Sequence, residues 1–571
     1  MPSSHRTPTA VDAVAEAWVD AVVELDPVTA TYIGRGGDDR FGDYSPSGAD
    51  AFAEAARRAL TAIEKAEPVD AEDRITRADL TRDLQVQLDL VDARWHLRDL
   101  NVIASPVQDI RSVFDLMPTS SIEDWAAIGR RLAGVPDAIG GYIETLRAGI
   151  AAGVVPARRQ ALEVVSQIAR YTGDQGFFAT FVGEAHPDEG DLPASLARDL
   201  ADRAGAARVA YADLSRFLAA ELAPAAAESD GVGRDLYALH SRRFLGAAVD
   251  LDETYEWGLA ELARMTAEQE EVAERIRAGA TVAEAIAFLD SDPAHVLHGT
   301  AALQEWMQEV SDEAIEQLGA SHFDIPEPVR RLECRIAPTQ EGGIYYTGPT
   351  DDFSRPGRMW WSVPPGVDEF ATWRERTTVY HEGVPGHHLQ IGQAVYLRDR
   401  LNSWRRLLAG TSGHAEGWAL YAERLMADLG YLDDPGDRLG MLDGQRMRAA
   451  RVVLDIGVHL GKRTPDGAGV WDHGYALDFL RRNVNMSDAF VQFEVNRYLG
   501  WPGQAPSYKV GQRIWEEIRE AARRTEGDAF SLRSFHSRAL SLGGVGLDTL
   551  RAALQADPSP LTRHLDERTR S

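Results

Sequence analysis

The chain has 571 residues, and its 60 basic and 89 acidic side chains give a net charge of −29. A chain of this length can bury a large hydrophobic core. The excess negative charge repels phosphate backbones and anionic lipid surfaces, so we expect neither nucleic acid nor a membrane as a partner. The single cysteine, Cys334, excludes an internal disulfide bond and agrees with a reducing, cytoplasmic location.

Helical periodicity dominates the first half of the chain. Between Met1 and Leu25, acidic residues at four-residue spacing interrupt the apolar positions, which indicates an amphipathic helix and not a signal peptide. Apolar residues also recur at three- and four-residue spacing in longer segments, such as 122–150, 196–222 and 252–277. No run approaches the length that is needed to cross a bilayer. The pattern therefore predicts a mainly α fold.

The periodicity changes near residue 330. Residues 332–336 alternate between apolar and charged side chains, which indicates a β-strand, and residues 359–363 are the candidate partner strand. We expect loops between them, at residues 342–346 and 349–357. Tyr345 and Tyr346, in the first of these loops, are candidate substrate contacts.

The most informative segment is Tyr380–Gln390, which reads Tyr-His-Glu-Gly-Val-Pro-Gly-His-His-Leu-Gln. In the shorter motif His-Glu-x-x-His, two imidazoles one helical turn apart bind the same zinc ion, and the glutamate acts as the general base. Here two further residues separate the histidines. On an unbroken helix His387 would lie about 9 Å along the axis from His381 and roughly 120° around it, which zinc–nitrogen bonds of about 2.0–2.1 Å cannot span.

The inserted pair Pro385-Gly386 can resolve this difficulty, because proline cannot donate the helical hydrogen bond and glycine tolerates backbone angles that other residues avoid. If the pair bulges out of the helix, the remainder reads His-Glu-Gly-Val-His. We therefore predict His381 and His387 as zinc ligands and Glu382 as the general base. His388 is left to support a ligand or to contact substrate. The alternative is a proline-kinked helix that carries structural histidines.

A third ligand is needed, because a catalytic zinc ion commonly has three protein ligands and one open position. The segment 414–425 places Glu416 and Glu423 seven residues apart, on one face of a predicted helix among apolar neighbours. Burial of these carboxylates without a partner would be costly, so a metal, an arginine or a histidine should lie opposite. We predict Glu416 as the third ligand and Glu423 as an acceptor that orients a histidine. An ion pair with an arginine one helical turn away is the alternative for Glu423.

Four motifs occur in the order His-Glu-Gly-Val-Pro-Gly-His-His-Leu-Gln, Glu-Gly-Trp-Ala-Leu-Tyr-Ala-Glu, Arg-Ala-Ala-Arg-Val-Val-Leu-Asp-Ile-Gly-Val-His and Arg-Tyr-Leu-Gly-Trp-Pro-Gly-Gln-Ala-Pro-Ser-Tyr-Lys-Val-Gly. This series resembles the bacterial family known as domain of unknown function 885. Its members look like helical zinc metallopeptidases of the gluzincin type, similar in plan to carboxypeptidase Taq and angiotensin-converting enzyme. The resemblance implies a single large multi-helix peptidase-like fold over residues 1–571, with an N-terminal helical region (1–320) and a catalytic region (321–571).

The resemblance also implies that the small β-sheet borders the active-site cleft. An exposed strand there could align a peptide by strand addition. The alternative is a sheet that only braces the catalytic helix.

Tyrosines commonly stabilise the tetrahedral intermediate in related enzymes, so Tyr508 and Tyr498 are candidates for this role. Tyr508 is favoured because Ser-Tyr-Lys-Val-Gly resembles an element of carboxypeptidase Taq. Either tyrosine could instead be a core residue. Arg451, Asp455 and His459 follow one another at four-residue steps on one helical face. They form either a structural ion-pair column, or a group in which Asp455 supports the site and His459 stabilises charge.

An exopeptidase needs a fixed charge that binds one end of its substrate. The basic residues near the motifs are Arg355, Arg358, Arg497, Lys509 and Arg513. We therefore expect zinc-dependent hydrolysis of short peptides or peptide-like small molecules, by an exopeptidase such as a carboxypeptidase or a dipeptidase. The alternatives are a hydrolase of a non-peptide amide metabolite and a non-catalytic scaffold that binds metal or peptide.

Overall fold

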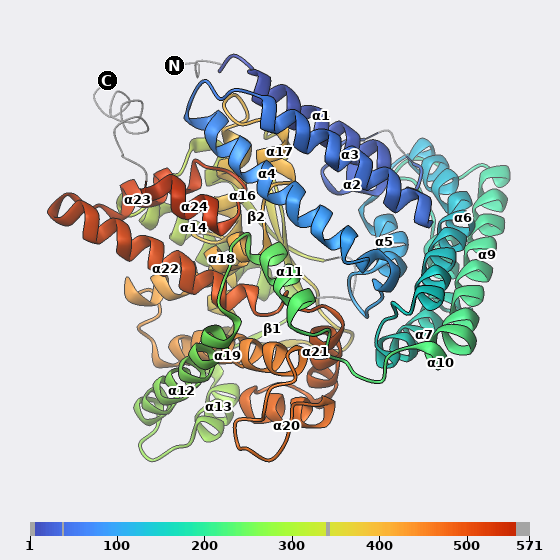
Figure 1. The fold of residues 1–571 in the computed structure, drawn as a ribbon. Coiled ribbons are helices and arrows are strands. Elements are labelled where there is room, and N and C mark those ends of the chain that lie inside the picture. The colour runs from blue at the N-terminus through green and yellow to red at the C-terminus, as the bar shows by residue number, and fades with distance from the viewer. Residues whose placement is uncertain (1–5, 37–38, 338–342, 556–571) are drawn as a thin grey trace.

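The computed structural model describes residues 6–36, 39–337 and 343–555, and this part of the chain is mainly helical (Figure 1). The predicted fold class is therefore confirmed. No helix in these segments is both long enough and apolar enough to cross a membrane.

The N-terminal helices are α1 (Ala10–Leu25), α2 (Pro27–Tyr32), α3 (Pro46–Lys65) and α4 (Ala71–Asp92). Helix α1 is the predicted amphipathic helix, and the side chain of Thr9 caps its first turn. Helices α1, α3 and α4 lie side by side at the top of Figure 1. They share a hydrophobic core with α17 (Ser403–Leu407), so the start of the chain packs directly on its C-terminal half.

A second group of helices covers one side of the molecule, at the right in Figure 1, and has its own hydrophobic core. The long helices of this group agree with the predicted segments 122–150 and 196–222. Its members are α5 (Pro106–Ser112), η2 (Val113–Leu116), α6 (Ile122–Ala152), α7 (Arg158–Thr172), α8 (Phe177–Gly183), α9 (Ala194–Phe217), the π-helical turn η3 (Leu218–Leu222) and α10 (Ala223–Ala225). The short helix η1 (Trp95–Arg98) precedes the group and contacts α6.

The largest hydrophobic core joins the middle of the chain to its C-terminal half. Helices α12 and α19 pack along each other in this core, so the regions on either side of the boundary near residue 320 share it. The helices before that boundary are α11 (Arg234–Leu245), α12 (Leu251–Ile276), α13 (Val282–Ser291), η4 (Pro293–His295) and α14 (Thr300–Ser321). Those after it, besides α17, are η5 (Glu327–Arg330), α15 (Thr372–Glu382), α16 (His387–Tyr396), α18 (Ser412–Asp428), α19 (Pro435–His459), α20 (His473–Asn483), α21 (Asp488–Gly500), α22 (Ser507–Glu526), η6 (Gly527–Ala529), α23 (Leu532–Leu540) and α24 (Leu547–Gln555).

A small sheet has the strand order β2-β4-β3, in which β2 (Leu332–Ile336) runs parallel to β4 (Gly357–Trp361) and β3 (Ile344–Thr347) runs antiparallel to it. The predicted strand at 332–336 and its partner are thus confirmed, with the partner two residues earlier than expected. The loop predicted at 342–346 is wrong from Ile344 onward, and residue 342 lies outside the described residues. The strand β3 was missed because a run of four residues after two glycines has too few alternations to reveal its period. A separate ribbon pairs β1 (Val296–His298) with β5 (Glu369–Ala371), directly before α15.

Candidate metal centre

The inserted residues break the helix into two. Helix α15 ends at Glu382 and α16 begins at His387, and the turn between them contains a cis peptide bond before Pro385. The chain therefore forms a compact turn between two helices, where we predicted a bulge within one helix. The N–H of Gly386 donates to the carbonyl of Tyr380 at 3.0 Å, and the indole of Trp418 donates to the carbonyl of Pro385 at 2.9 Å.

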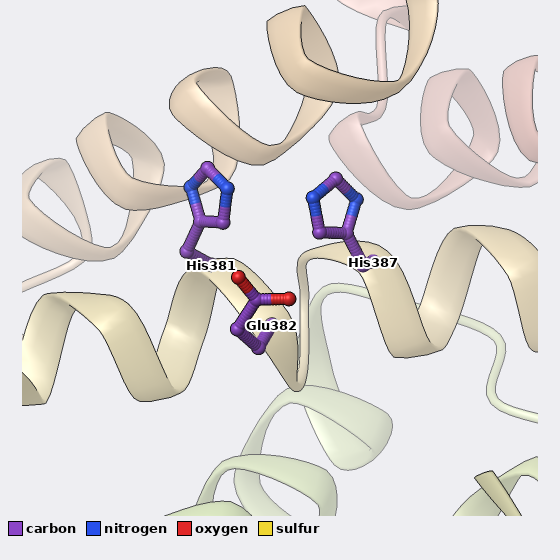
Figure 2. A group of neighbouring side chains, drawn as sticks. All are labelled: His381, Glu382 and His387. Carbon is purple, nitrogen blue, oxygen red and sulfur yellow. The ribbon is translucent and has the colours of Figure 1, made fainter. Parts of the chain in front are cut away.

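Gly386 is required at this turn for a steric reason. A Cβ atom at this position would lie 1.8 Å from the carbonyl oxygen of His381, so no other residue fits without a shift of the backbone. The close approach brings the two imidazole rings together, with their centroids 4.9 Å apart and their planes perpendicular. Figure 2 shows both rings on the same side of the broken helix, with the Glu382 carboxylate between them.

The imidazoles of His381 and His387 converge on one oxygen of Glu416, which α18 contributes. His381 Nε2 lies 3.3 Å and His387 Nε2 lies 3.6 Å from Glu416 Oε2. Two ligand atoms of one tetrahedral zinc ion, each bonded at about 2.0–2.2 Å, lie roughly 3.3–3.6 Å apart. The same Glu416 oxygen is buried and accepts no hydrogen bond from the described residues. Spacing, donor type and the unsatisfied oxygen all fit a zinc ion.

Electrostatics at this point favour a cation. Burial disfavours a charge on His381, but the adjacent carboxylates of Glu416 and Glu423 outweigh burial and raise the pKa of the imidazole to about 10. Burial also opposes the ionisation of Glu416, and the nearby His387 outweighs it and holds the pKa of this carboxyl group well below its usual value. The site therefore keeps an ionised carboxylate next to the two imidazoles.

Glu423 fixes the orientation of His381. Its side chain is 1% exposed, and its Oε1 accepts a hydrogen bond from His381 Nδ1 at 2.7 Å. Gln445 donates to the other oxygen at 3.3 Å. When a metal ion displaces the proton on Nε2, an imidazole that donates from Nδ1 presents the lone pair of Nε2, which is the atom that faces Glu416. The nearest arginine, Arg448, comes from α19 and lies 3.8 Å away, so the expected alternative of an ion pair within the same helix is not found for Glu423 among the described residues.

Glu382 faces the same space as the two histidines. Its carboxylate and the two imidazoles offer one atom each within 4.8 Å of one another. Burial raises the pKa of the Glu382 carboxyl group, and the two histidines only partly oppose this shift. A carboxyl group with a raised pKa can both accept and return a proton near neutral pH.

His388 points away from this group. Its Nε2 donates to the carbonyl of Val329 at 2.7 Å, so Nδ1 accepts a hydrogen bond from the Tyr346 hydroxyl at 2.9 Å. Burial lowers the pKa of His388 to about 4, which keeps the ring neutral. His388 therefore anchors Tyr346 on strand β3 to the start of α16 and leaves His387 as the available imidazole.

A cavity of about 610 Å³ opens over the candidate metal site, and its size suits a small ligand. It brings together most of the predicted site residues with several that the sequence analysis did not select. The predicted residues in its lining are His381, Glu382, His387, Glu416, Glu423, Tyr345, Tyr346, Arg451, Arg497 and Tyr508. The additional charged residues are Arg374, Glu375, Asp443 and Arg448.

Tyr508 is the cavity tyrosine nearest to the arginines of α19. It lies in the first turn of α22, with the guanidinium carbon of Arg451 5.3 Å and that of Arg448 6.0 Å from the ring centroid. Burial raises the pKa of Tyr508, so the hydroxyl stays protonated. Within the described segments this hydroxyl makes no hydrogen bond, so it is available to a ligand in the cavity.

Tyr498, Asp455 and His459 lie outside the cavity lining. Tyr498 accepts a hydrogen bond from Arg451 at 2.6 Å, and its backbone carbonyl accepts one from His459 at 3.0 Å. Asp455 accepts from the hydroxyl of Tyr237 at 2.6 Å, and burial raises the pKa of Asp455 to about 7. The structure therefore places Tyr498, Asp455 and His459 in buried hydrogen bonds outside the cavity lining.

Four of the five basic residues that were considered for substrate binding are engaged elsewhere. Arg355 donates to the carbonyl of Gly348, Arg358 to Glu333, Lys509 to Gln445 and Arg513 to Glu253, and none of the four lines the cavity. Arg497 does line it, and it donates to Glu494 at 3.1 Å.

A family described as bacterial protein of unknown function (DUF885) matches residues 27–554 of the chain. The chain belongs to this family. The match confirms the resemblance that the four motifs indicated. No curated protein matches the chain.

Two solved structures share the fold. A protein of Colwellia psychrerythraea, described as a putative lipoprotein, aligns at 22% identity over 98% of this chain and 100% of its own, with a TM-score of 0.81. A protein of Shewanella oneidensis, described in the same words and as of unknown function, aligns at 18% identity over 95% of this chain and 99% of its own, with a TM-score of 0.71. A carboxypeptidase of Pyrococcus furiosus aligns at 11% identity over 99% of this chain and 100% of its own, and its TM-score of 0.39 is too low to indicate a shared fold.

The charged cavity residues that were not predicted had a partial signal in the sequence. Arg448 lies three residues before Arg451 on α19, so it shares the helical face that the sequence analysis had already selected. Arg374 and Glu375 lie at the start of α15, the helix that carries His381. Their distance of six or seven residues from the motif gave no reason to place them in the same cavity.

Proposed function

We propose that this protein is a zinc-dependent peptidase that hydrolyses short peptides, with the plan of the gluzincins. The convergence of His381 Nε2 and His387 Nε2 on Glu416 Oε2, at 3.3 and 3.6 Å, carries the proposal. His381, His387 and Glu416 would hold the ion, and Glu423 would hold His381 in the required orientation.

Zinc at these residues would supply a Lewis acid that activates water and polarises the carbonyl group of the peptide bond that is cleaved. Glu382 would accept a proton from the attacking water at its carboxylate and then deliver this proton to the nitrogen of the leaving amine. Tyr508 would donate its hydroxyl hydrogen to the oxygen that becomes negative during attack. Its raised pKa keeps this proton in place.

Positive charge in the cavity favours an exopeptidase. Arg451 and Arg497 both bind the single carboxylate of Glu494, so one of their two charges is not balanced there. Arg448 makes no hydrogen bond within the described residues, and its nearest acidic atom is 3.8 Å away on Glu423. These three guanidinium groups would bind the terminal carboxylate of a substrate through paired hydrogen bonds.

Strand β3 would align the substrate backbone. The strand order leaves one side of β3 unpaired within the described sheet, and Ile344, Tyr345 and Tyr346 line the cavity. An extended peptide could therefore add to this edge, as peptides do at other exposed strands. The bond between Tyr346 and His388 would fix the strand relative to the zinc ligands.

The proposal is tested by elemental mass spectrometry of the purified protein beside Glu416→Ala, followed by incubation of the zinc-loaded protein with a mixed library of short peptides. We expect about one zinc ion per chain in the wild-type protein, its loss in the variant, and cleavage near one end of the peptides. Zinc without cleavage of any peptide would support a hydrolase of other amides or a binding scaffold. Failure to bind zinc would refute the ligand assignment.

A further inference from the structure

The charges that line the cavity are separated along its length. Arg374 donates to Asp443 at 3.1 Å, so this pair is internally balanced. Glu375, next to it on α15, is half-buried and forms no hydrogen bond or ion pair with any described residue. Arg451 lies eight residues beyond Asp443 on α19, about 12 Å along the helix axis. One end of the cavity therefore holds a carboxyl group without a partner among the described residues, and the other end holds an excess of positive charge.

We propose that Glu375 binds the free amino group of the substrate, so that the cavity selects short peptides with an unblocked amino terminus. The inference rests on the proposed peptidase function and adds to it the chemistry of the second substrate end. Glu375 is a substrate-binding residue in this proposal, and it takes no part in bond cleavage.

The position of Glu375 sets the length of peptide that fits. It lies six residues before His381 on the same helix, about 9 Å along the axis. An extended peptide advances about 3.3–3.6 Å per residue, so this distance holds two to three residues. With one further residue after the cleaved bond, a substrate with its amino group at Glu375 and its carboxylate at the arginines is a tripeptide or a tetrapeptide.

The environment of Glu375 suits an ammonium ligand. Burial disfavours the ionised carboxylate and raises the pKa of Glu375 to about 7, and the neighbouring Arg374 only partly compensates. A cation that enters the cavity would restore the ionised form and gain a charge-assisted hydrogen bond. A neutral or acetylated amino terminus would offer neither.

The test compares an equimolar pool of tripeptides and tetrapeptides with the same pool after acetylation of the amino termini. A hydrogen bond between charged groups corresponds to roughly 10- to 100-fold in binding, so the wild-type protein should prefer the free amines by this factor in kcat/KM, mainly through KM. Glu375→Gln should abolish the preference, so that free and acetylated peptides are hydrolysed with similar kcat/KM. Glu375→Asp, which keeps the charge, should retain a reduced preference.

Glu369→Gln is the matched control, because Glu369 lies six residues before Glu375, is 75% exposed and is not part of the cavity lining. This variant should behave as the wild-type protein. A preference for free amines that survives in Glu375→Gln, or equal rates for both pools in the wild-type protein, would overturn the role of Glu375 and leave the peptidase function intact.

A binding measurement separates this inference from the proposed function. The Glu382→Gln protein is incubated with both pools, and retained peptides are identified by ultrafiltration and mass spectrometry. If retention by the Glu382→Gln protein requires both the free amine and Glu375, while the wild-type protein hydrolyses neither pool, the peptidase function is refuted and the amine site is upheld. Retention of neither pool, together with no hydrolysis, would refute both.

Discussion

The contact between Glu423 and His381 gives a prediction that can be worked out from the structure. Glu423 Oε1 accepts from His381 Nδ1 at 2.7 Å in a fully buried environment, and this bond leaves Nε2 free to face Glu416. Replacement of an acceptor that supports a metal-binding histidine typically weakens metal affinity by about 10- to 100-fold, or roughly 1.4–2.7 kcal/mol. We expect Glu423→Gln to weaken zinc affinity by about 10-fold, because an amide oxygen can still accept the hydrogen bond but lacks the negative charge.

Glu423→Ala should weaken zinc affinity by about 100-fold, because it leaves His381 Nδ1 buried without an acceptor. The assay is competition for zinc against a chromophoric chelator, with circular dichroism to verify that the apo proteins remain folded. Asp428→Asn is the control, because Asp428 ends the same helix and its side chain is 49% exposed. If both Glu423 variants bound zinc as tightly as the wild-type protein, the orientation of His381 by Glu423 would be refuted.

Four further predictions concern the same site. Glu382→Gln should keep one zinc ion per chain while hydrolysis falls by about 10²- to 10⁴-fold, and unchanged turnover would exclude Glu382 as the base. His387→Ala should lose zinc and His388→Ala should keep it, as measured by elemental mass spectrometry; the reverse result would exchange their roles. Gly386→Ala should lower the free energy of unfolding by about 1–3 kcal/mol or release zinc, because the added Cβ would lie 1.8 Å from the carbonyl oxygen of His381. Gly140→Ala is the control and should do neither, because the space around Gly140 is open. Tyr508→Phe should lower kcat by about 10²- to 10³-fold with zinc content unchanged, and an equal kcat would remove Tyr508 from the reaction.

Patterns that depend on local chemistry were read correctly from the sequence. Apolar spacing predicted the long helices α6 and α9, and alternation predicted β2, because these periods follow from the geometry of a single element. The need for a break between His381 and His387 also followed from helix geometry alone. The form of the break did not, because the turn is held by Trp418 from another helix as well as by its own backbone.

The sequence was less informative for residues whose positions depend on the packing of different helices. Tyr498 and Tyr508 occur in the same motif, but Tyr508 faces the cavity and Tyr498 packs against Arg451. The resemblance favoured Tyr508 for the catalytic role, and the packing of α21 and α22 decides which of the two tyrosines lines the cavity. Arg448 begins the third motif but has no charge pattern that marks it, and Glu375 lies in none of the four motifs, so only the packing of α15 and α19 around the cavity brings them to the site.

The sequence by itself determined the helical class of this protein, the membership of its family, and the set of imidazole and carboxylate groups that could bind a metal. Each of these depends on residue types and on spacing within one segment. The tertiary structure alone decided which groups meet. It brings Glu416 and Glu423 of α18 to the two histidines and turns His388 away from them. It also places Glu375 and Arg451 at different positions along the cavity. Such encounters depend on how whole helices pack, and the free energy of that packing is spread over many contacts that no short motif contains.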